Sequence, residues 1–170
     1  MTLTGTFGTT LALKVAKAFD LSDGTVPVAD SENVKVWTIT SGTGLDKANL
    51  IFVDQRTVAA STNDDLDLIG GGLLDPFGDA LAFVQLKGIY IRAALANPST
   101  ITIGNVANAV PVFGAATHSL SLQPDGVLQI VMLSATAITV AAGSGDILRI
   151  TNDSGAATMT YDIVLVGANA

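Results

Sequence analysis

The feature that most constrains the fold of this chain is the alternation of apolar and polar residues along its hydrophobic runs. A period of two is typical of a β-strand that buries one face and exposes the other. The clearest alternating runs are residues 34–40, 80–91, 100–103, 147–151 and 158–166. We therefore expect an all-β protein with antiparallel strands.

Short clusters of Gly, Pro, Asp, Asn and Ser separate these runs. They occur at residues 41–44, 70–72, 75–78, 97–99, 124–126 and 143–146. Such residues supply the positive φ angles and fixed φ angles that tight turns need. Many short strands joined by turns of this kind predict a β-sandwich or a jelly roll.

The first 30 residues differ from the rest. A Gly/Thr-rich stretch at residues 4–10 precedes the segment 11–19, whose apolar residues fit both a strand and a helix. We expect residues 1–30 to form an N-terminal docking arm or an edge strand, and residues 31–170 to form the β-sandwich domain. A first strand of the same sheet is the alternative interpretation of the segment.

The composition favours burial between subunits. Hydrophobic residues make up 49% of the 170 residues and charged residues only 14%. A lone monomer has little charge with which to cover its surface. An interface of standard size would remove about 800 Å² of accessible surface from water on each partner. We therefore expect a homo-oligomer.

The charge and the hydropathy exclude two classes of partner. The formal net charge is −7 and the basic residues are scattered, so we expect no direct nucleic-acid binding. The mean hydropathy is +0.52, yet no run approaches the roughly 18 apolar residues of a membrane-spanning helix. Residues 1–5 lack the pattern of a secretory signal, and the chain contains no cysteine. We expect no membrane partner.

The sequence contains no recognisable catalytic pattern. His118 is the only histidine, and no serine lies in a nucleophile-elbow motif. The Gly-x-Gly pieces at residues 42–44 and 143–145 lack the context of a nucleotide-binding loop. Asp64, Asp65 and Asp67 form the one weak candidate for calcium, without the spacing of an EF-hand. We therefore expect neither a cofactor nor a resident metal.

Three ordered segments carry a resemblance to a known class of proteins. They are residues 53–60 (VDQRTVAA) leading into 65–68 (DLDL), residues 75–78 (DPFG) with the strand through 91–93 (IRA), and residues 145–152 (GDILRITN) with 161–167 (YDIVLVG). Together they resemble small virion proteins of tailed bacteriophages, of the capsid decoration or head-spike kind. The resemblance covers roughly residues 48–167.

The resemblance implies a non-enzymatic protein, made in the host cytoplasm, that assembles as a symmetric oligomer on the capsid surface or at another virion position, with a trimer favoured. Its partner would be the major capsid protein or another virion protein. Hydrophobicity, and not the resemblance, selects the candidate docking or inter-subunit residues of the N-terminal segment. These are Phe7, Leu11, Leu13, Val15 and Phe19.

Two other functions stay open at this point. A lectin-like β-sandwich could bind host-surface glycans through the Gly-rich loop at residues 69–79. An enzyme such as a depolymerase would need a carboxylate pair brought together by the fold. The candidates for such a pair are Asp54, Asp65, Asp79 and Asp125.

Overall fold

The structure is a computed structural model that describes residues 2–16, 28–70 and 72–170. Within these residues every regular element is a β-strand, and no helix is long and apolar enough to cross a membrane. The strands are, in chain order, β1 (Gly5–Ala16), β2 (Val28–Ser41), β3 (Lys47–Ala48), β4 (Leu50–Val58), β5 (Asn63–Asp67), β6 (Gln85–Ala93), β7 (Ile101–Gly104), β8 (Ser119–Leu122), β9 (Val127–Val131), β10 (Ile138–Thr139), β11 (Ile147–Asn152) and β12 (Met159–Ala168).

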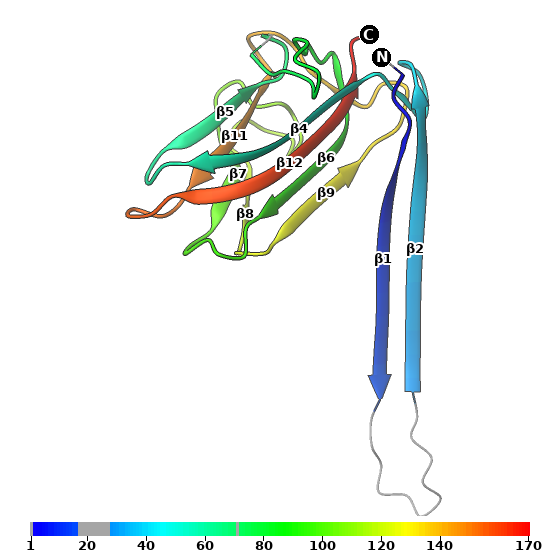
Figure 1. Ribbon diagram of the computed structural model, residues 1–170, viewed down its shortest axis with the longest axis vertical. Coiled ribbons are helices and arrows are strands. Elements are labelled where there is room, and N and C mark those ends of the chain that lie inside the picture. Colours follow the sequence, from blue (N-terminus) through cyan, green and yellow to red (C-terminus); the bar gives the residue numbers. More distant parts are fainter. Residues whose placement is uncertain (1, 17–27, 71) are drawn as a thin grey trace, which may run out of the picture.

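Two sheets pack face to face and form the body of the molecule, which we call the sandwich (Figure 1). The first sheet has the strand order β4-β12-β6-β9, and the short strand β10 pairs with the start of β6. The second sheet has the order β5-β11-β7-β8. All pairings within the two sheets are antiparallel. The structure confirms the predicted all-β class.

The strand order is that of one long hairpin rolled up on itself. β7 pairs with β8, β6 with β9, β5 with β11 and β4 with β12, so the partners nest around the connection between β7 and β8. Rolling this nested hairpin into two sheets brings β12 beside β6 and β11 beside β7. This arrangement is the jelly roll, one of the two architectures that the sequence predicted.

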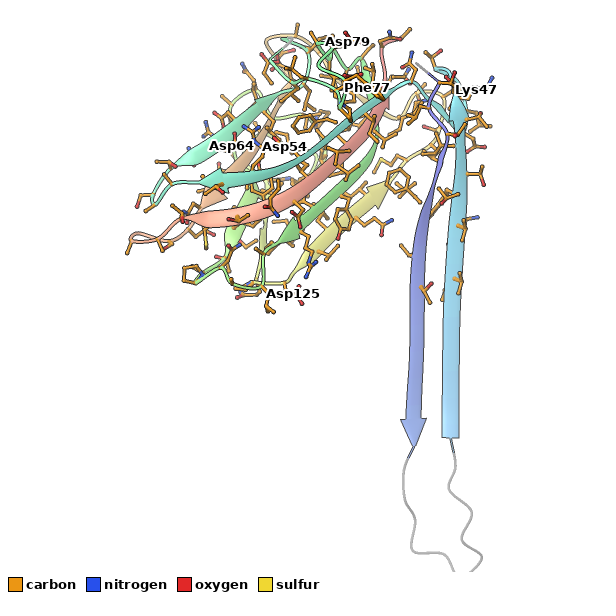
Figure 2. All side chains as sticks on the ribbon, viewed as in Figure 1. Lys47, Asp54, Asp64, Phe77, Asp79 and Asp125 are labelled. Carbon is orange, nitrogen blue, oxygen red and sulfur yellow. The ribbon has the colours of Figure 1, made fainter. Side chains whose placement is uncertain are left out.

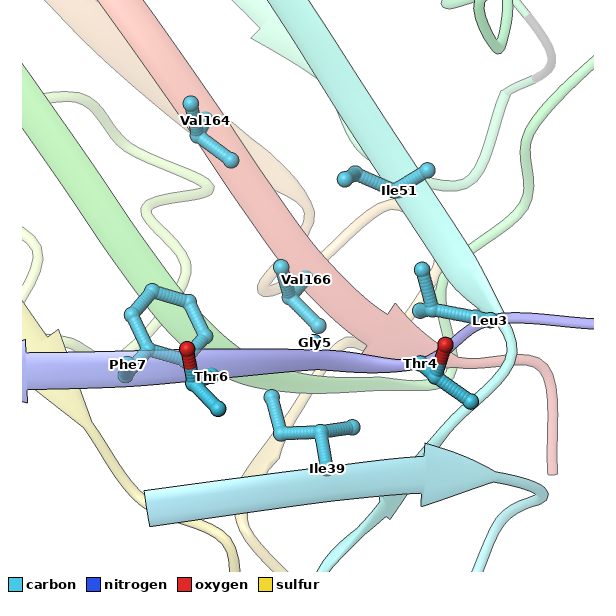
Figure 3. A pocket seen from close by; sticks show the side chains of 9 residues that line it. All are labelled: Leu3, Thr4, Gly5, Thr6, Phe7, Ile39, Ile51, Val164 and Val166. Atoms are coloured by element: carbon cyan, nitrogen blue, oxygen red, sulfur yellow. The ribbon is translucent and has the colours of Figure 1, made fainter. Parts of the chain in front are cut away.

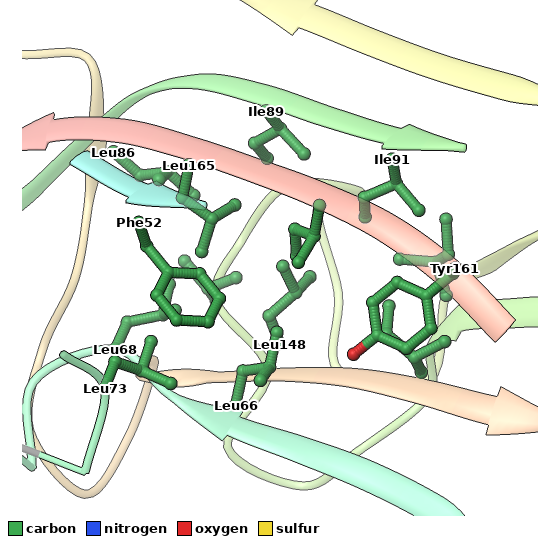
Figure 4. Close-up of a cluster of buried hydrophobic side chains, with 14 of the residues drawn as sticks. Phe52, Leu66, Leu68, Leu73, Leu86, Ile89, Ile91, Leu148, Tyr161 and Leu165 are labelled. Carbon is green, nitrogen blue, oxygen red and sulfur yellow. The ribbon is translucent and has the colours of Figure 1, made fainter. Parts of the chain in front are cut away.

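The core lies between the two sheets (Figure 4). β12 shows how the alternation builds it, since Met159, Tyr161, Ile163 and Leu165 are fully buried while the residues between them face outward. Each fully buried apolar side chain stabilises the fold by roughly 1.5–3 kcal/mol. The sandwich is therefore held together by the residues that the period of two identified.

Strands β1 and β2 form a separate antiparallel hairpin, which we call the arm (Figure 1). Their register runs from Gly5 opposite Ile39 to Ala16 opposite Val28. The arm therefore extends beyond residue 30, where the sequence analysis placed its end. The alternating run at residues 34–40 belongs to the arm and not to the sandwich.

The run at residues 80–91 also differs from the expectation, because only its second half is a strand. Leu81 and Phe83 are buried at alternate positions, as in a strand. Their backbone N–H groups, however, donate to single carbonyls of Leu73 and Leu68 and not to a continuous ladder. The alternation correctly identified burial, and the missing strand partner explains why β6 begins only at Gln85.

Candidate functional site

The arm is a ribbon that leaves the sandwich at one end and projects away from it (Figure 1). At about 3.4 Å per residue, the 12 residues of β1 span about 40 Å. In the described part of the chain, β1 pairs only with β2, and β2 adds just a two-residue parallel contact with β3. The far half of the arm therefore carries unpaired backbone edges, which are templates for pairing with another chain.

The arm root, which comprises residues 3–8 and 36–41, covers part of the outer face of the β4-β12-β6-β9 sheet. A second hydrophobic cluster, distinct from the core, lies there and consists of Ile39, Ala48, Leu133 and Val166. The partly buried residues packed around it are Leu3, Phe7, Trp37, Ile51, Val131 and Val164. An outward sheet face is normally polar, so the apolar strip is explained by the arm root that covers it.

A glycine in β6 makes room for the arm root. A Cβ added at Gly88 would lie 2.5 Å from Cζ and 2.8 Å from Cε2 of Phe7, so the ring occupies space that any larger residue at position 88 would take. Trp37 is the register partner of Phe7, and the Lys35 ammonium lies 5.8 Å from the centre of the Trp37 ring. The arm root is thus fixed by aromatic packing against a glycine.

A buried lysine fixes the turn that follows β2. Lys87 is 1% exposed, and its Nζ donates hydrogen bonds to the carbonyl oxygens of Thr43 (2.7 Å) and Gly44 (2.6 Å). Burial lowers the pKa of Lys87, while the negative charge of Asp46 acts in the opposite direction. The N–H of Asp46 also donates to the carbonyl of Leu133 at 2.9 Å. These bonds tie the base of the arm to the sandwich.

An apolar cavity of about 170 Å³ lies between the arm root and the sandwich (Figure 3). It is lined by Leu3, Thr4, Gly5, Thr6, Phe7, Ile39, Ile51, Val164 and Val166. Of these, only the two threonines carry polar side-chain atoms. We call this space the arm-root cavity.

The arm and the sandwich differ in charge and in surface character. Residues 42–170 carry six of the seven net negative charges of the chain. On β2, Val34 and Val36 are 52% and 57% exposed. The arm therefore offers a nearly neutral surface with apolar side chains, whereas the sandwich is acidic.

The second sheet has a polar outer face. Arg149 binds Asp65 with two hydrogen bonds of 2.6 Å across β11 and β5. The hydroxyl of Thr102 lies 2.7 Å from that of Ser121 and donates to Asp153 at 2.8 Å. This surface resembles an ordinary solvated sheet face, in contrast with the apolar strip that the arm root covers on the first sheet.

A charged network closes the side of the sandwich where β4 and β5 are the edge strands. The Arg56 guanidinium donates to both Asp64 oxygens at 2.5 and 3.0 Å and to Asp54 at 3.1 Å, and the Tyr161 hydroxyl donates to Asp64 at 2.7 Å. Burial alone would raise the pKa of Asp64, but the bonds from Arg56 and Tyr161 outweigh it and lower the pKa. Burial and the bond to Asp64 raise the pKa of Tyr161. The network is therefore ionised at Asp64 and neutral at Tyr161.

A groove of about 320 Å³ lies beside this network. Residues Phe52 to Asp54 and Arg56 line one side, and residues 72–74 of the Gly-rich loop line the other. Asp54 and Arg56 supply a carboxylate and a guanidinium at its wall. The groove therefore places the Gly-rich loop opposite the charged side chains of Asp54 and Arg56.

The structure separates the residues that the sequence analysis proposed for docking. Phe7 lies in the arm root and contacts its own sandwich at Gly88. Leu11, Leu13 and Val15 lie in β1, at the same alternate positions as Phe7, although their side chains are outside the described part. Phe19 lies outside the described residues. Docking by these residues stays a prediction.

The weak calcium candidates are not brought together. Asp64 binds Arg56 and Tyr161, and Asp65 binds Arg149. Asp67 accepts hydrogen bonds from the backbone N–H groups that follow it, at Ile69 (3.1 Å) and residue 70 (2.7 Å). Among the described residues, no group of three His, Cys, Asp or Glu side chains could hold a metal ion.

His118 serves the local backbone. Its exposed ring lies at the end of the connection before β8, with Nδ1 2.8 Å from the carbonyl oxygen of Phe113. No serine or carboxylate is hydrogen-bonded to the ring in the part of the chain that the structure describes. The geometry of a nucleophile and its base is thus not formed around His118 there.

The sequence patterns did not identify three residues that shape the arm root and the loop at residues 74–80. Gly88 and Lys87 contact residues more than 40 positions away in sequence, so no local pattern signals their roles. Phe77 is 78% exposed. Its position inside an Asp-Pro-Phe-Gly turn was a usable signal, since a turn at the surface rarely buries a ring.

Comparison of the chain with models of protein families, with curated proteins and with solved structures finds no match.

Proposed function

We propose that this chain is a non-enzymatic structural protein of a tailed-bacteriophage virion, which oligomerises and decorates or stabilises the capsid surface. The observation that carries the proposal is the arm, a ribbon of 12 register pairs that extends well beyond its root. A two-stranded hairpin alone is marginally stable in water, and a third strand or a packed face is needed to hold it. A partner chain would supply this support.

The distribution of charge supports the same division of roles. Broad contact between the acidic faces of two sandwiches brings like charges together, while the nearly neutral arm can enter a close contact without that repulsion. The acidic sandwich suits basic patches of a shell protein through complementary charge. We propose the major capsid protein or another virion protein as the partner, and a trimer as the oligomer that the resemblance implies.

The jelly roll is compatible with this role by analogy. The architecture occurs in viral capsid domains and also in lectins, so the fold alone does not select a function. The selection rests on the arm, which has no evident use in a compact ligand-binding module.

A shortened arm tests the proposal. Thr9 and Lys35 are register partners, so residues 10–34 can be replaced by Asn-Gly, the turn that best closes a two-residue hairpin. The variant keeps the whole arm root and the sandwich. We expect the full chain, and not this variant, to sediment with phage particles that lack the protein.

The control is the circular dichroism spectrum and the thermal unfolding of the same variant, which should show an intact sandwich. Attachment of the shortened variant as strong as that of the full chain would exclude the arm as the docking element.

The groove beside the Gly-rich loop supports glycan binding as a second candidate function. Asp54 and Arg56 at its wall are groups that hydrogen-bond sugar hydroxyls. A glycan array tests this directly. Binding that is lost in Asp54→Ala would favour the lectin-like function.

A further inference from the structure

The most exposed large apolar side chain in the described part of the chain is that of Phe77, at 78% exposure. It lies in the loop between Leu74 and Ala80, which are joined by an isolated β-bridge. A Phe ring in water costs free energy that burial in a partner would recover. The ring is therefore a candidate anchor for an interface, where aromatic residues are enriched.

The loop holds Phe77 in a defined position. The Asp75 carboxylate accepts hydrogen bonds from the backbone N–H groups of Phe77 (2.8 Å) and Asp79 (2.9 Å). The N–H of Asp75 donates to the carbonyl of Asp79 at 2.8 Å, and Gly78 has a φ of +94° that glycine adopts without strain. The backbone that carries the ring is thus preorganised, and little backbone entropy is lost when the loop binds.

The same chain contains a cavity that fits a ring of this size. The arm-root cavity holds about 170 Å³ and is lined by Leu, Ile, Val and Phe side chains (Figure 3). An apolar cavity of about 150 Å³ is large enough to bind benzene. The volume and the lining therefore suit a single Phe side chain.

We propose that Phe77 of one copy of this chain inserts into the arm-root cavity of a second copy. The inference deepens the proposed function and rests on its self-assembly. The exposed ring and the arm-root cavity lie on different surfaces of one chain. In each contact, Phe77 with its loop at residues 75–79, which we call the knob, therefore enters the arm-root cavity of the next copy. All such contacts are satisfied when two copies bind each other reciprocally, or when several copies related by a rotation axis form a closed ring. A ring of three copies corresponds to the proposed trimer.

Charge complementarity favours the same partner. The knob carries Asp75 and Asp79 on either side of Phe77. Lys47 is exposed on β3, where it pairs with Thr40, the residue that follows the cavity residue Ile39. Figure 2 shows Lys47, Phe77 and Asp79 at the end of the molecule from which the arm departs. An acidic knob would thus approach a cavity that has a lysine beside it.

Two variants of the full chain test the two halves of the contact. Phe77→Ser removes the knob. Gly5→Leu places a side chain in the arm-root cavity, because Gly5 is one of its lining residues. The substitution should be tolerated, since a Cβ at Gly5 meets nothing within 4 Å and Gly5 has no positive φ. Leu95→Ser is the matched control, since Leu95 is 70% exposed and has no part in the contact.

The measurement is the self-association constant from sedimentation equilibrium, with thermal unfolding recorded for each variant. We expect Phe77→Ser and Gly5→Leu each to weaken association by at least about 30-fold, as for truncation of an interface hot spot, with an unchanged circular dichroism spectrum. Leu95→Ser should associate like the original chain.

A chain that associates equally well in both variants would overturn the proposed contact and leave arm-mediated assembly standing. A chain that is monomeric throughout would also overturn it. Particle sedimentation of the shortened-arm variant tests the proposed function separately.

Discussion

Replacement of Gly88 by alanine is the sharpest test of how the arm is attached. The new Cβ would lie 2.5 Å from Cζ of Phe7, whereas carbon atoms in contact are about 3.5–4.0 Å apart. The ring must therefore move by about 1 Å or more. Overpacking of this kind costs about 1–3 kcal/mol, while the partly buried Phe7 ring contributes only about 1 kcal/mol of burial. We expect the ring to leave the sheet.

The only tryptophan of the chain reports this displacement. Trp37 is the register partner of Phe7, so displacement of the Phe7 ring should shift the Trp37 fluorescence emission toward that of a more solvent-exposed indole. Gly8→Ala is the matched control, because a Cβ at Gly8 meets its nearest atoms at 3.9 Å. The sandwich should keep its circular dichroism spectrum. An unchanged emission spectrum and unchanged unfolding in Gly88→Ala would refute the described packing.

Three further substitutions test the interior of the molecule. Asp64 has a lowered pKa, so its stabilising effect is complete above its unfolded pKa of about 3.9 and is lost as the pH falls through the folded pKa. Asp64→Asn should therefore lower the free energy of unfolding in urea by about 2 kcal/mol at pH 7. If the original chain stayed more stable than Asp64→Asn by the same amount in acid, the ion pair with Arg56 would be contradicted. Asn152 is 2% exposed, and three carbonyl oxygens at 2.9–3.0 Å share the two N–H groups of its Nδ2. Asn152→Ala should therefore lower the free energy of unfolding by about 3 kcal/mol, and a loss below about 1 kcal/mol would be inconsistent with that role. Lys87→Met leaves the carbonyls of Thr43 and Gly44 without their donor and should lower the free energy of unfolding by about 1–2 kcal/mol. The turn after β2 should also be cleaved by a protease faster than in the original chain. Equal cleavage rates would argue against the anchoring role of Lys87.

The alternation of apolar residues predicted much of the sandwich because burial on one face is a local pattern. β11 and β12 follow the predicted runs closely, and the inner positions of β12 are the fully buried ones. The same pattern could not identify strand partners. It therefore assigned residues 34–40 to the sandwich, although β2 pairs with β1 in the arm.

The candidate site was less predictable because its contacts join distant parts of the chain. Arg56 and Asp64 are eight residues apart, but Tyr161 reaches them only through the pairing of β12 with β4. Gly88 meets Phe7 only because the arm root lies on β6. Such contacts depend on the tertiary arrangement, which no spacing in the sequence shows.

Self-assembly can be measured as the solution mass of the purified full chain, by light scattering across a broad concentration range. We expect a closed oligomer, with a trimer favoured, that dissociates in Phe77→Ser. A monodisperse monomer at every concentration would contradict it.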